Sequence, residues 1–141
     1  MVYKTILVVD DSAEIRWITE IYLRGAGYDV ATAANGLEGL EYLRGHPATA
    51  AVVLDLWMPV LDGLEFLKQR RREVKIAAIP VVLYSSEPDA EEHAEALGAA
   101  AVLPKTASRE CLVAAVAHVL RPYSHRRQTS DDHRAKQICF F

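Results

Sequence analysis

The chain has 141 residues and a formal net charge of -3, with 51% hydrophobic and 25% charged residues. This length suits a single domain with a buried core, and the charge gives no general attraction to nucleic acid. No apolar run reaches transmembrane length, no signal-peptide pattern opens the chain, and the two cysteines, Cys111 and Cys139, lack metal-ligand spacing. We therefore predict a reduced, cytoplasmic protein with neither DNA nor a membrane as a direct partner.

Apolar and helix-like segments alternate along the chain, a pattern typical of a parallel sheet flanked by helices. The predicted strands are 4–9, 28–33, 51–54, 80–84 and 100–103, and the predicted helices are 12–24, 35–45, a segment beginning at 62–63, 89–97 and 108–120. The second strand is less apolar and is expected near a sheet edge, whereas the third is expected to be buried on both faces. The predicted fold class is α/β, a doubly wound five-stranded parallel sheet with helices on both faces.

Capping residues and periodic apolar residues mark the helices. Ser12 and Ser108 stand where a side-chain oxygen can accept a hydrogen bond from the first turn. In the helix that begins at 62–63, Leu64 and Leu67 are expected to face inward. The basic run Arg70-Arg71-Arg72 of the same helix is expected to lie largely in solvent.

The composition changes after residue 121. Polar and charged residues dominate as far as residue 136, and the periodic apolar pattern stops. We predict one domain over residues 1–121 and a tail over residues 122–141 that forms no domain of its own. The tail ends in the apolar segment 138–141, for which flexibility, docking on the domain and docking on a second copy in a homodimer all stay open.

Four of the five predicted strands end in polar groups with related chemistry. Asp10 and Asp11 follow the first strand, Asp55 the third, Ser85 the fourth and Lys105 the fifth. Because the carboxyl ends of parallel strands meet at one edge, three carboxylates would repel there unless a cation lay among them, and Mg²⁺ is the hard cation that suits them. A lysine and a hydroxyl suit a phosphoryl group. A carboxylate such as Asp55 can itself form an acyl phosphate.

Each of these residues also has an ordinary structural explanation when taken alone. The pair Asp10-Asp11 can stabilise the start of a helix, Ser85 can be a turn hydroxyl, and Lys105 can be a solvated loop residue. Asp55 is the hardest to explain in this way, because a buried strand directs it to the sheet edge. The functional interpretation is favoured because it alone accounts for all of these residues together.

The chain resembles the receiver domain of bacterial two-component response regulators, of the stand-alone, single-domain type. The matching features are Asp10-Asp11, the segment Asp55-Leu56-Trp57-Met58-Pro59 with Asp62-Gly63 behind it, Ser85 and Lys105, each at or after the end of a strand. The resemblance extends from about residue 4 to about residue 120. It implies a flavodoxin-like sheet in the strand order 2-1-3-4-5.

By this resemblance, Asp55 is a phosphoacceptor that receives its phosphoryl group from a sensor histidine kinase or a histidine phosphotransfer protein. The implied Mg²⁺ ligands are Asp10, Asp11, Asp55 and the backbone carbonyl of Trp57. Ser85 is the implied switch hydroxyl, and Lys105 pairs with the phosphoryl oxygens. The domain is expected to signal to a protein target through its last two helices and fifth strand. It is not expected to be an enzyme beyond its own phosphoryl uptake and loss.

The sequence departs from the family pattern at two positions. Val102 stands three residues before the lysine, where many receivers have a switch aromatic, and Pro104 precedes Lys105, although the usual proline follows the lysine. We interpret Tyr84 as a strand residue and not as a substitute for the missing aromatic. For Trp57, exposed packing and the shielding of an acyl phosphate from water both stay open.

Two other functions use parts of the same chemistry. A Mg²⁺-dependent phosphohydrolase that passes through an aspartyl phosphate usually has a second acid two residues after the nucleophile, and here that position is Trp57. A phosphorylation-independent scaffold has no need of the intact Asp10, Asp11, Asp55 and Lys105. Both alternatives are therefore less favoured than a receiver.

Overall fold

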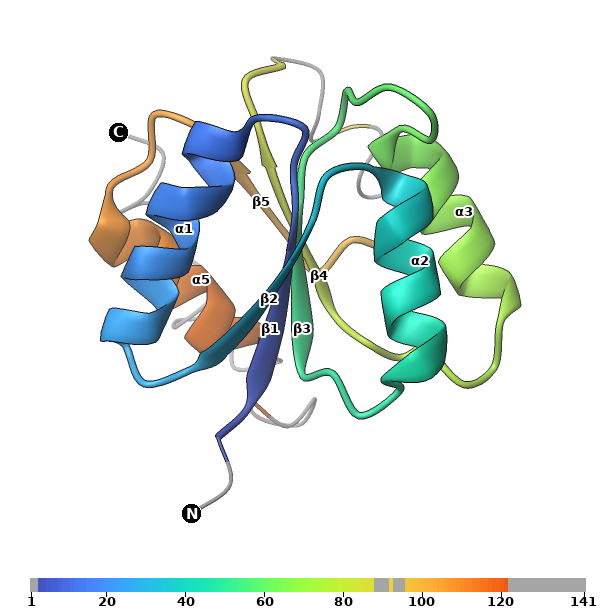
Figure 1. Cartoon of the computed structure of the whole chain (residues 1–141), viewed down its shortest axis with the longest axis horizontal. Helices are drawn as coiled ribbons and strands as arrows, with labels where there is room; N and C mark the ends of the chain where they lie inside the picture. Colours follow the sequence, from blue (N-terminus) through green and yellow to red (C-terminus); the bar gives the residue numbers. More distant parts are fainter. Residues whose placement is uncertain (1–2, 88–91, 93–95, 122–141) are drawn as a thin grey trace.

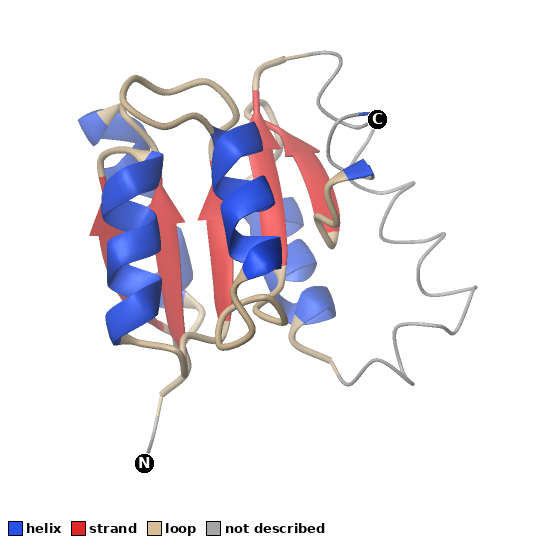
Figure 2. Ribbon diagram, turned by 90° about the vertical axis from the view of Figure 1, so that its right-hand side faces the viewer, coloured by secondary structure: helices blue, strands red, loops and turns tan. Residues whose placement is uncertain are grey.

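A computed structural model of the protein describes residues 3–87, 92 and 96–121. Its centre is a five-stranded parallel sheet (Figure 1). The strands are β1 (Thr5–Val9), β2 (Asp29–Ala33), β3 (Ala51–Leu54), β4 (Val81–Ser85) and β5 (Ala101–Pro104). Their order in the sheet is β2-β1-β3-β4-β5, and their arrows point the same way in Figure 2. The predicted fold class and strand order are confirmed, with the second strand at an edge of the sheet.

The described helices are α1 (Ala13–Gly25), α2 (Gly36–Gly45), α3 (Gly63–Arg72) and α5 (Arg109–Val119). Each begins after a side chain that accepts a hydrogen bond from an N–H group of its first turn. The capping side chains are those of Ser12, Asn35, Asp62 and Ser108. The predicted helix at 89–97 lies largely outside the described residues, and the predicted tail at 122–141 lies wholly outside them.

The helices cover both faces of the sheet, with α1 and α5 on one face and α2 and α3 on the other (Figure 1). Successive residues of a strand point to opposite faces. In β3, Ala51 and Val53 belong to the apolar cluster under α1 and α5, whereas Val52 and Leu54 belong to the cluster under α2 and α3. None of the four is more than 2% exposed. The third strand is therefore buried on both faces, as predicted.

The pairing register determines which residues leave the sheet together. Val9 of β1 pairs with Leu54 of β3, so Asp10 and Asp55 each come directly after the last paired residue of two adjacent strands. The N–H group of Asp55 also donates to the carbonyl of Val9 at 2.9 Å. The two acidic side chains are therefore held next to each other at the carboxyl edge of the sheet.

Arg70 in α3 is buried, and the prediction that it lies in solvent is wrong. Its side chain is 3% exposed. Its guanidinium donates through Nη1 to the carbonyl of Ala77 and through Nη2 to the carbonyl of Gly98, the latter at 3.3 Å. Its Nε is buried without a hydrogen-bond partner in the described part of the chain. Burial, followed by the charge of the neighbouring Arg71, lowers the pKa of Arg70.

Helix periodicity is the reason for this burial. Arg70 lies three and four residues after Leu67 and Phe66, both of which are fully buried, and residues at this spacing share one side of a helix. Arg71 and Arg72 turn away from that side and are exposed, as predicted. The basic run is therefore divided between a solvated surface and an internal position.

Candidate phosphoacceptor and metal site

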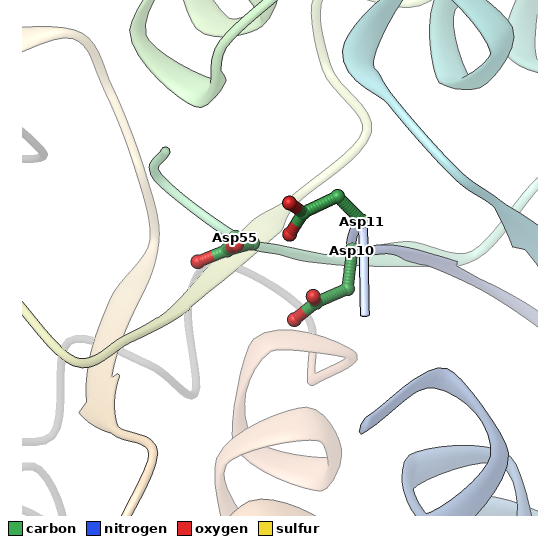
Figure 3. Close-up of side chains that lie close together, drawn as sticks. All are labelled: Asp10, Asp11 and Asp55. Carbon is green, nitrogen blue, oxygen red and sulfur yellow. The ribbon is translucent and has the colours of Figure 1, made fainter. Parts of the chain in front are cut away.

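Three carboxylates gather at the carboxyl edge of the sheet (Figure 3). Asp10 and Asp11 follow β1 and Asp55 follows β3, and one oxygen from each lies within 4.8 Å of the others. Asp10 and Asp55 are 3% and 6% exposed, whereas Asp11 is exposed. A donor set of carboxylate oxygens fits a hard divalent cation. The cluster can therefore bind a metal ion.

Backbone N–H groups orient both buried carboxylates. Asp10 accepts a hydrogen bond from the N–H of Ser12 at 2.9 Å, and Asp55 accepts one from the N–H of Leu56 at 2.9 Å. In each case the donor belongs to the chain that leaves the strand, so the turn itself fixes the carboxylate. The buried acids are thus preorganised by their own loops.

Lys105 brings a cation into the cluster. Its Nζ lies 3.0 Å from Oδ2 of Asp10 and 3.3 Å from Oδ1 of Asp55. Burial alone lowers the pKa of Lys105, but hydrogen bonding and charge attraction from Asp10, and then from Asp55, outweigh this and raise it. The lysine is therefore charged at neutral pH. The ammonium thus pairs with two of the three carboxylates of the cluster.

Among the three carboxylates of the cluster, Asp55 has a raised pKa. Burial and then the charge of Asp10 raise its pKa, Lys105 and the N–H of Leu56 oppose the rise, and the net pKa is about 6. The ordinary value is 3.8. An Asp with a pKa near the working pH is typical of a functional site, and bringing a cation to the cluster favours the ionised form of this side chain.

Ser85 ends β4 and is buried, whereas its neighbour Ser86 is exposed. Its Oγ accepts a hydrogen bond from the N–H of Glu87 at 3.1 Å. Its carbonyl accepts a hydrogen bond from the N–H of Lys105, also at 3.1 Å. Pairing of β4 with β5 therefore places the serine beside the start of the lysine-bearing loop.

The start of α3 packs closely against the backbone of Asp55. The N–H of Gly63 donates to the carbonyl of Leu56 at 2.7 Å. A Cβ atom at Gly63 would overlap the carbonyl oxygen of Asp55, so only glycine permits this approach. The Asp62-Gly63 pair of the sequence thus combines a helix cap with a contact that fixes the acidic loop.

The loop between β3 and α3 carries exposed apolar side chains and local strain. Trp57 is half exposed, and Val60 is more exposed still. The φ angle of Val60 is 73°, and the N–H of Leu61 donates to the carbonyl of Pro59 at 2.8 Å, as in a γ-turn. A β-branched residue at positive φ is strained. The two roles considered for Trp57, carbonyl ligand and shield, stay predictions.

Tyr84, which the sequence interpretation left as an ordinary strand residue, contacts the loop that carries Lys105. Its hydroxyl donates to the backbone carbonyl of Lys105 at 3.2 Å. Val102 lies on the opposite face of the sheet, against the cluster under α2 and α3. No sequence signal identifies the contact of Tyr84, because its partner is a backbone oxygen that every residue carries.

A parallel α/β sheet with an acidic cluster and a lysine at its carboxyl edge fits the class of receiver-type signalling domains. The sequence model of the response regulator receiver domain matches residues 6–117. Over 122 residues the chain is 37% identical to the DNA-binding transcriptional regulator NtrC of Escherichia coli (strain K12), covering 86% of this chain and 26% of NtrC. Over 113 residues it is 34% identical to the two-component response regulator ORR5 of Oryza sativa subsp. japonica, covering 75% of this chain and 84% of ORR5.

Solved structures show the same likeness. The chemotaxis response regulator CheY4 of Vibrio cholerae is 32% identical with a TM-score of 0.77, over 84% of this chain and 99% of CheY4. A putative response regulator from Chloroflexus aurantiacus is 29% identical with a TM-score of 0.80, over 84% of this chain and 98% of that one.

The chain belongs to the response regulator receiver domain family, and the resemblance found in its sequence is confirmed. Domains of this family act in two-component phosphorelay signalling and interact with histidine kinases or phosphotransfer proteins. The chain spans about a quarter of the length of NtrC and about half that of the probable transcriptional regulator ycf27 of Porphyridium aerugineum. Within the described residues, no helix has the length and apolar character needed to cross a membrane.

Proposed function

We propose that Asp55 accepts a phosphoryl group from a phosphohistidine of a sensor histidine kinase or a histidine phosphotransfer protein. The observation that supports this most is the position of the Lys105 ammonium, 3.0 Å from Asp10 and 3.3 Å from Asp55, within a buried acidic cluster. One carboxylate in this arrangement can act as a nucleophile while the other acids hold a cation.

The transfer exchanges one bond to phosphorus for another. An oxygen of Asp55 attacks the phosphorus, the P–O bond forms, and the P–N bond breaks with its electron pair going to the imidazole, which takes a proton from water. Asp10, Asp11, Asp55 and the carbonyl of Trp57 would hold Mg²⁺, which would supply positive charge for the phosphoryl oxygens. Asp10 keeps the Lys105 ammonium beside the reacting oxygen, where it pairs with the incoming group.

The phosphorylated state differs from the free state in its charge. The acyl phosphate at Asp55 carries a charge of about -2, where the free carboxylate carries one negative charge. This group attracts Lys105 and the hydroxyl of Ser85, which in the free state accepts from the N–H of Glu87. This movement shifts the loop that follows β4 between two arrangements. We propose that a protein target is bound by the last two helices and β5, that no DNA contact is made, and that the protein works in the cytoplasm.

Intact-mass measurement after incubation with phosphoramidate and Mg²⁺ tests this proposal. The wild-type protein is expected to gain one phosphoryl group, and Asp55→Asn is expected to gain none. Asp29→Asn, which changes an exposed acid at the start of β2, is the matched control and is expected to react like the wild type. Equal uptake by Asp55→Asn and the wild type would refute the assignment of Asp55.

The same reaction separates the two alternative functions. A phosphohydrolase would release phosphate from a phosphomonoester over many turnovers, whereas a receiver is expected to react about once per phosphorylation and to lose its own phosphoryl group. A phosphorylation-independent scaffold would gain no mass with any phosphodonor. The closeness of the three carboxylates favours the receiver over the scaffold, because like charges at such distances are costly unless a cation is bound.

A further inference from the structure

Two consecutive residues of β4 hold the backbone of Lys105. The N–H of Lys105 donates to the carbonyl of Ser85 at 3.1 Å, and the hydroxyl of Tyr84 donates to the carbonyl of Lys105 at 3.2 Å. The backbone N–H and the backbone carbonyl of Lys105 are therefore both hydrogen-bonded to residues of β4. The first contact continues the pairing of β4 with β5, but the second requires a hydroxyl at this position of the strand.

The ring of Tyr84 is fixed by packing. Its side chain is 8% exposed and belongs to the cluster under α1 and α5, together with Leu103, Leu112 and Val116. Burial, and then the nearby Tyr22, raises the pKa of Tyr84 above its usual value, so the hydroxyl stays protonated and can donate. The packed ring of Tyr84 therefore holds its hydroxyl, a hydrogen-bond donor, against the loop that carries Lys105.

A fixed backbone at Lys105 favours its ion pairs, because one ammonium has to contact two carboxylates. The Lys105 ammonium reaches Asp10 and Asp55 at 3.0 and 3.3 Å, and a long side chain loses much rotamer freedom when it is held in this way. A backbone shift of the loop would move Nζ away from both oxygens. Pro104 restricts the backbone conformation before Lys105, and the hydrogen bond from the hydroxyl of Tyr84 restricts the backbone carbonyl of Lys105.

We infer that Tyr84 is a positioning residue for phosphoryl transfer, which acts through Lys105 by holding the carbonyl of that lysine. This inference rests on the proposed function of Asp55. Because Tyr84 and Ser85 are adjacent in β4, the lysine and the hydroxyl that are proposed to contact the phosphoryl group share one anchor. The aromatic group thus comes from β4 in this protein, on the face of the sheet opposite to Val102.

The substitution Tyr84→Phe keeps the ring and removes the hydroxyl. We expect the maximal rate of Mg²⁺-dependent phosphorylation by phosphoramidate to fall about fivefold, the size of effect that corresponds to one neutral hydrogen bond. The donor concentration at half-maximal rate is expected to change little, since the hydroxyl does not touch the donor. Tyr28→Phe is the matched control, because Tyr28 packs against the same cluster from the far end of β2, and it is expected to react at the wild-type rate.

A double-mutant cycle decides whether Tyr84 acts through the lysine. In a Lys105→Met background, Tyr84→Phe is expected to cause no further loss of rate, because the group that it positions is absent. A second fivefold loss in that background, or a wild-type rate for Tyr84→Phe alone, would overturn the inference. Failure of the wild-type protein itself to take up phosphoryl would instead overturn the proposed function. All rates are compared well below the unfolding temperature of each variant, measured by circular dichroism.

Discussion

Arg70 and Lys105 are two cationic side chains that are withdrawn from solvent, and they have different kinds of partner. Arg70 donates to the carbonyls of Ala77 and Gly98, whereas Lys105 lies between the carboxylates of Asp10 and Asp55. A carbonyl oxygen carries a fixed partial charge and cannot be protonated at ordinary pH. A carboxylate can be protonated, can bind a cation and can be phosphorylated.

The contrast shows that burial of a charge does not by itself identify a functional site. Arg70 ties the end of α3 to segments on either side of β4, and both of its hydrogen-bond acceptors in the described part of the chain are backbone carbonyls, which do not titrate. Lys105 faces two carboxylates, a kind of group whose charge can be changed by protonation, by a bound cation or by covalent modification. We therefore expect the contribution of Arg70 to the free energy of unfolding to be independent of pH and Mg²⁺. The contribution of Lys105 is expected to depend on both.

The largest expected effect is the loss of the buried guanidinium. Arg70→Ala is expected to lower the free energy of unfolding by about 3 kcal/mol, because it leaves buried carbonyls unpaired and opens a cavity. Urea unfolding monitored by circular dichroism measures this change. Arg71→Ala is the control, because the exposed Arg71 also donates to a carbonyl, that of Ala96, and a loss below about 1 kcal/mol is expected.

Added Mg²⁺ sharpens this first prediction. Mg²⁺ is expected to leave the stability difference between Arg70→Ala and the wild type unchanged, because the hydrogen bonds of Arg70 do not involve the acidic cluster of Asp10, Asp11 and Asp55. Recovery of stability in Mg²⁺ would contradict the distinction between Arg70 and Lys105.

The second expected effect concerns the lysine. Lys105→Met is expected to slow phosphoryl uptake about 100-fold, as the loss of a charge stabiliser in a transition state typically does. Without Mg²⁺ it is also expected to lower stability, because Asp10 and Asp55 then face each other without a cation. Mg²⁺ is expected to restore most of that stability and little of the rate, and thermal unfolding with and without the ion measures the difference.

The third prediction concerns pH. The folded-state pKa of Asp55 is about 6 and exceeds its ordinary value of 3.8, so the protonated form is favoured by folding. This contribution is fully present below pH 3.8 and is lost as the pH rises through 6. Relative to Asp55→Asn, the metal-free wild type is expected to lose about 2 kcal/mol of stability between pH 4 and pH 7.

Urea unfolding of both proteins at a series of pH values measures this difference. The difference is expected to shrink when Mg²⁺ is present, since the ion favours the carboxylate. A stability difference that stays flat across this range would show that the environment of Asp55 does not disfavour its charge.

The smallest expected effect lies in the loop after Asp55. Val60→Gly is expected to raise the free energy of unfolding by about 1 kcal/mol, because it removes the strain of a β-branched residue at a φ of 73°. Val74→Gly, at an exposed position without positive φ, is the control and is expected to lower it slightly. Equal effects of the two substitutions in urea unfolding would mean that the loop stores no strain.

Much of the architecture was predictable from local patterns. The apolar run at 51–54 and the capping residues Ser12 and Ser108 determine strands and helix starts by themselves. The convergence of Asp10 with Asp55 was predictable because parallel strands of similar length end at one edge. These features depend on side-chain type and spacing, which the sequence contains directly.

The remaining features depend on partners that a sequence does not display. Arg70 was expected in solvent because a basic run usually lies there, and its actual partners are backbone carbonyls 7 and 28 residues away. The contact of Tyr84 with the carbonyl of Lys105 has the same character. Val60 adopts a positive φ without the glycine or asparagine that usually announces it.

The central claim is that Asp55, within the acidic cluster, accepts the phosphoryl group of a phosphodonor, and chemical trapping in the unaltered protein tests it most directly. After phosphorylation with phosphoramidate and Mg²⁺, borohydride reduces an aspartyl phosphate to homoserine, which peptide mass spectrometry locates. We predict homoserine at position 55 alone, and none when Mg²⁺ is removed by a chelator. Homoserine at position 10 or 11, or none under any condition, would contradict the account.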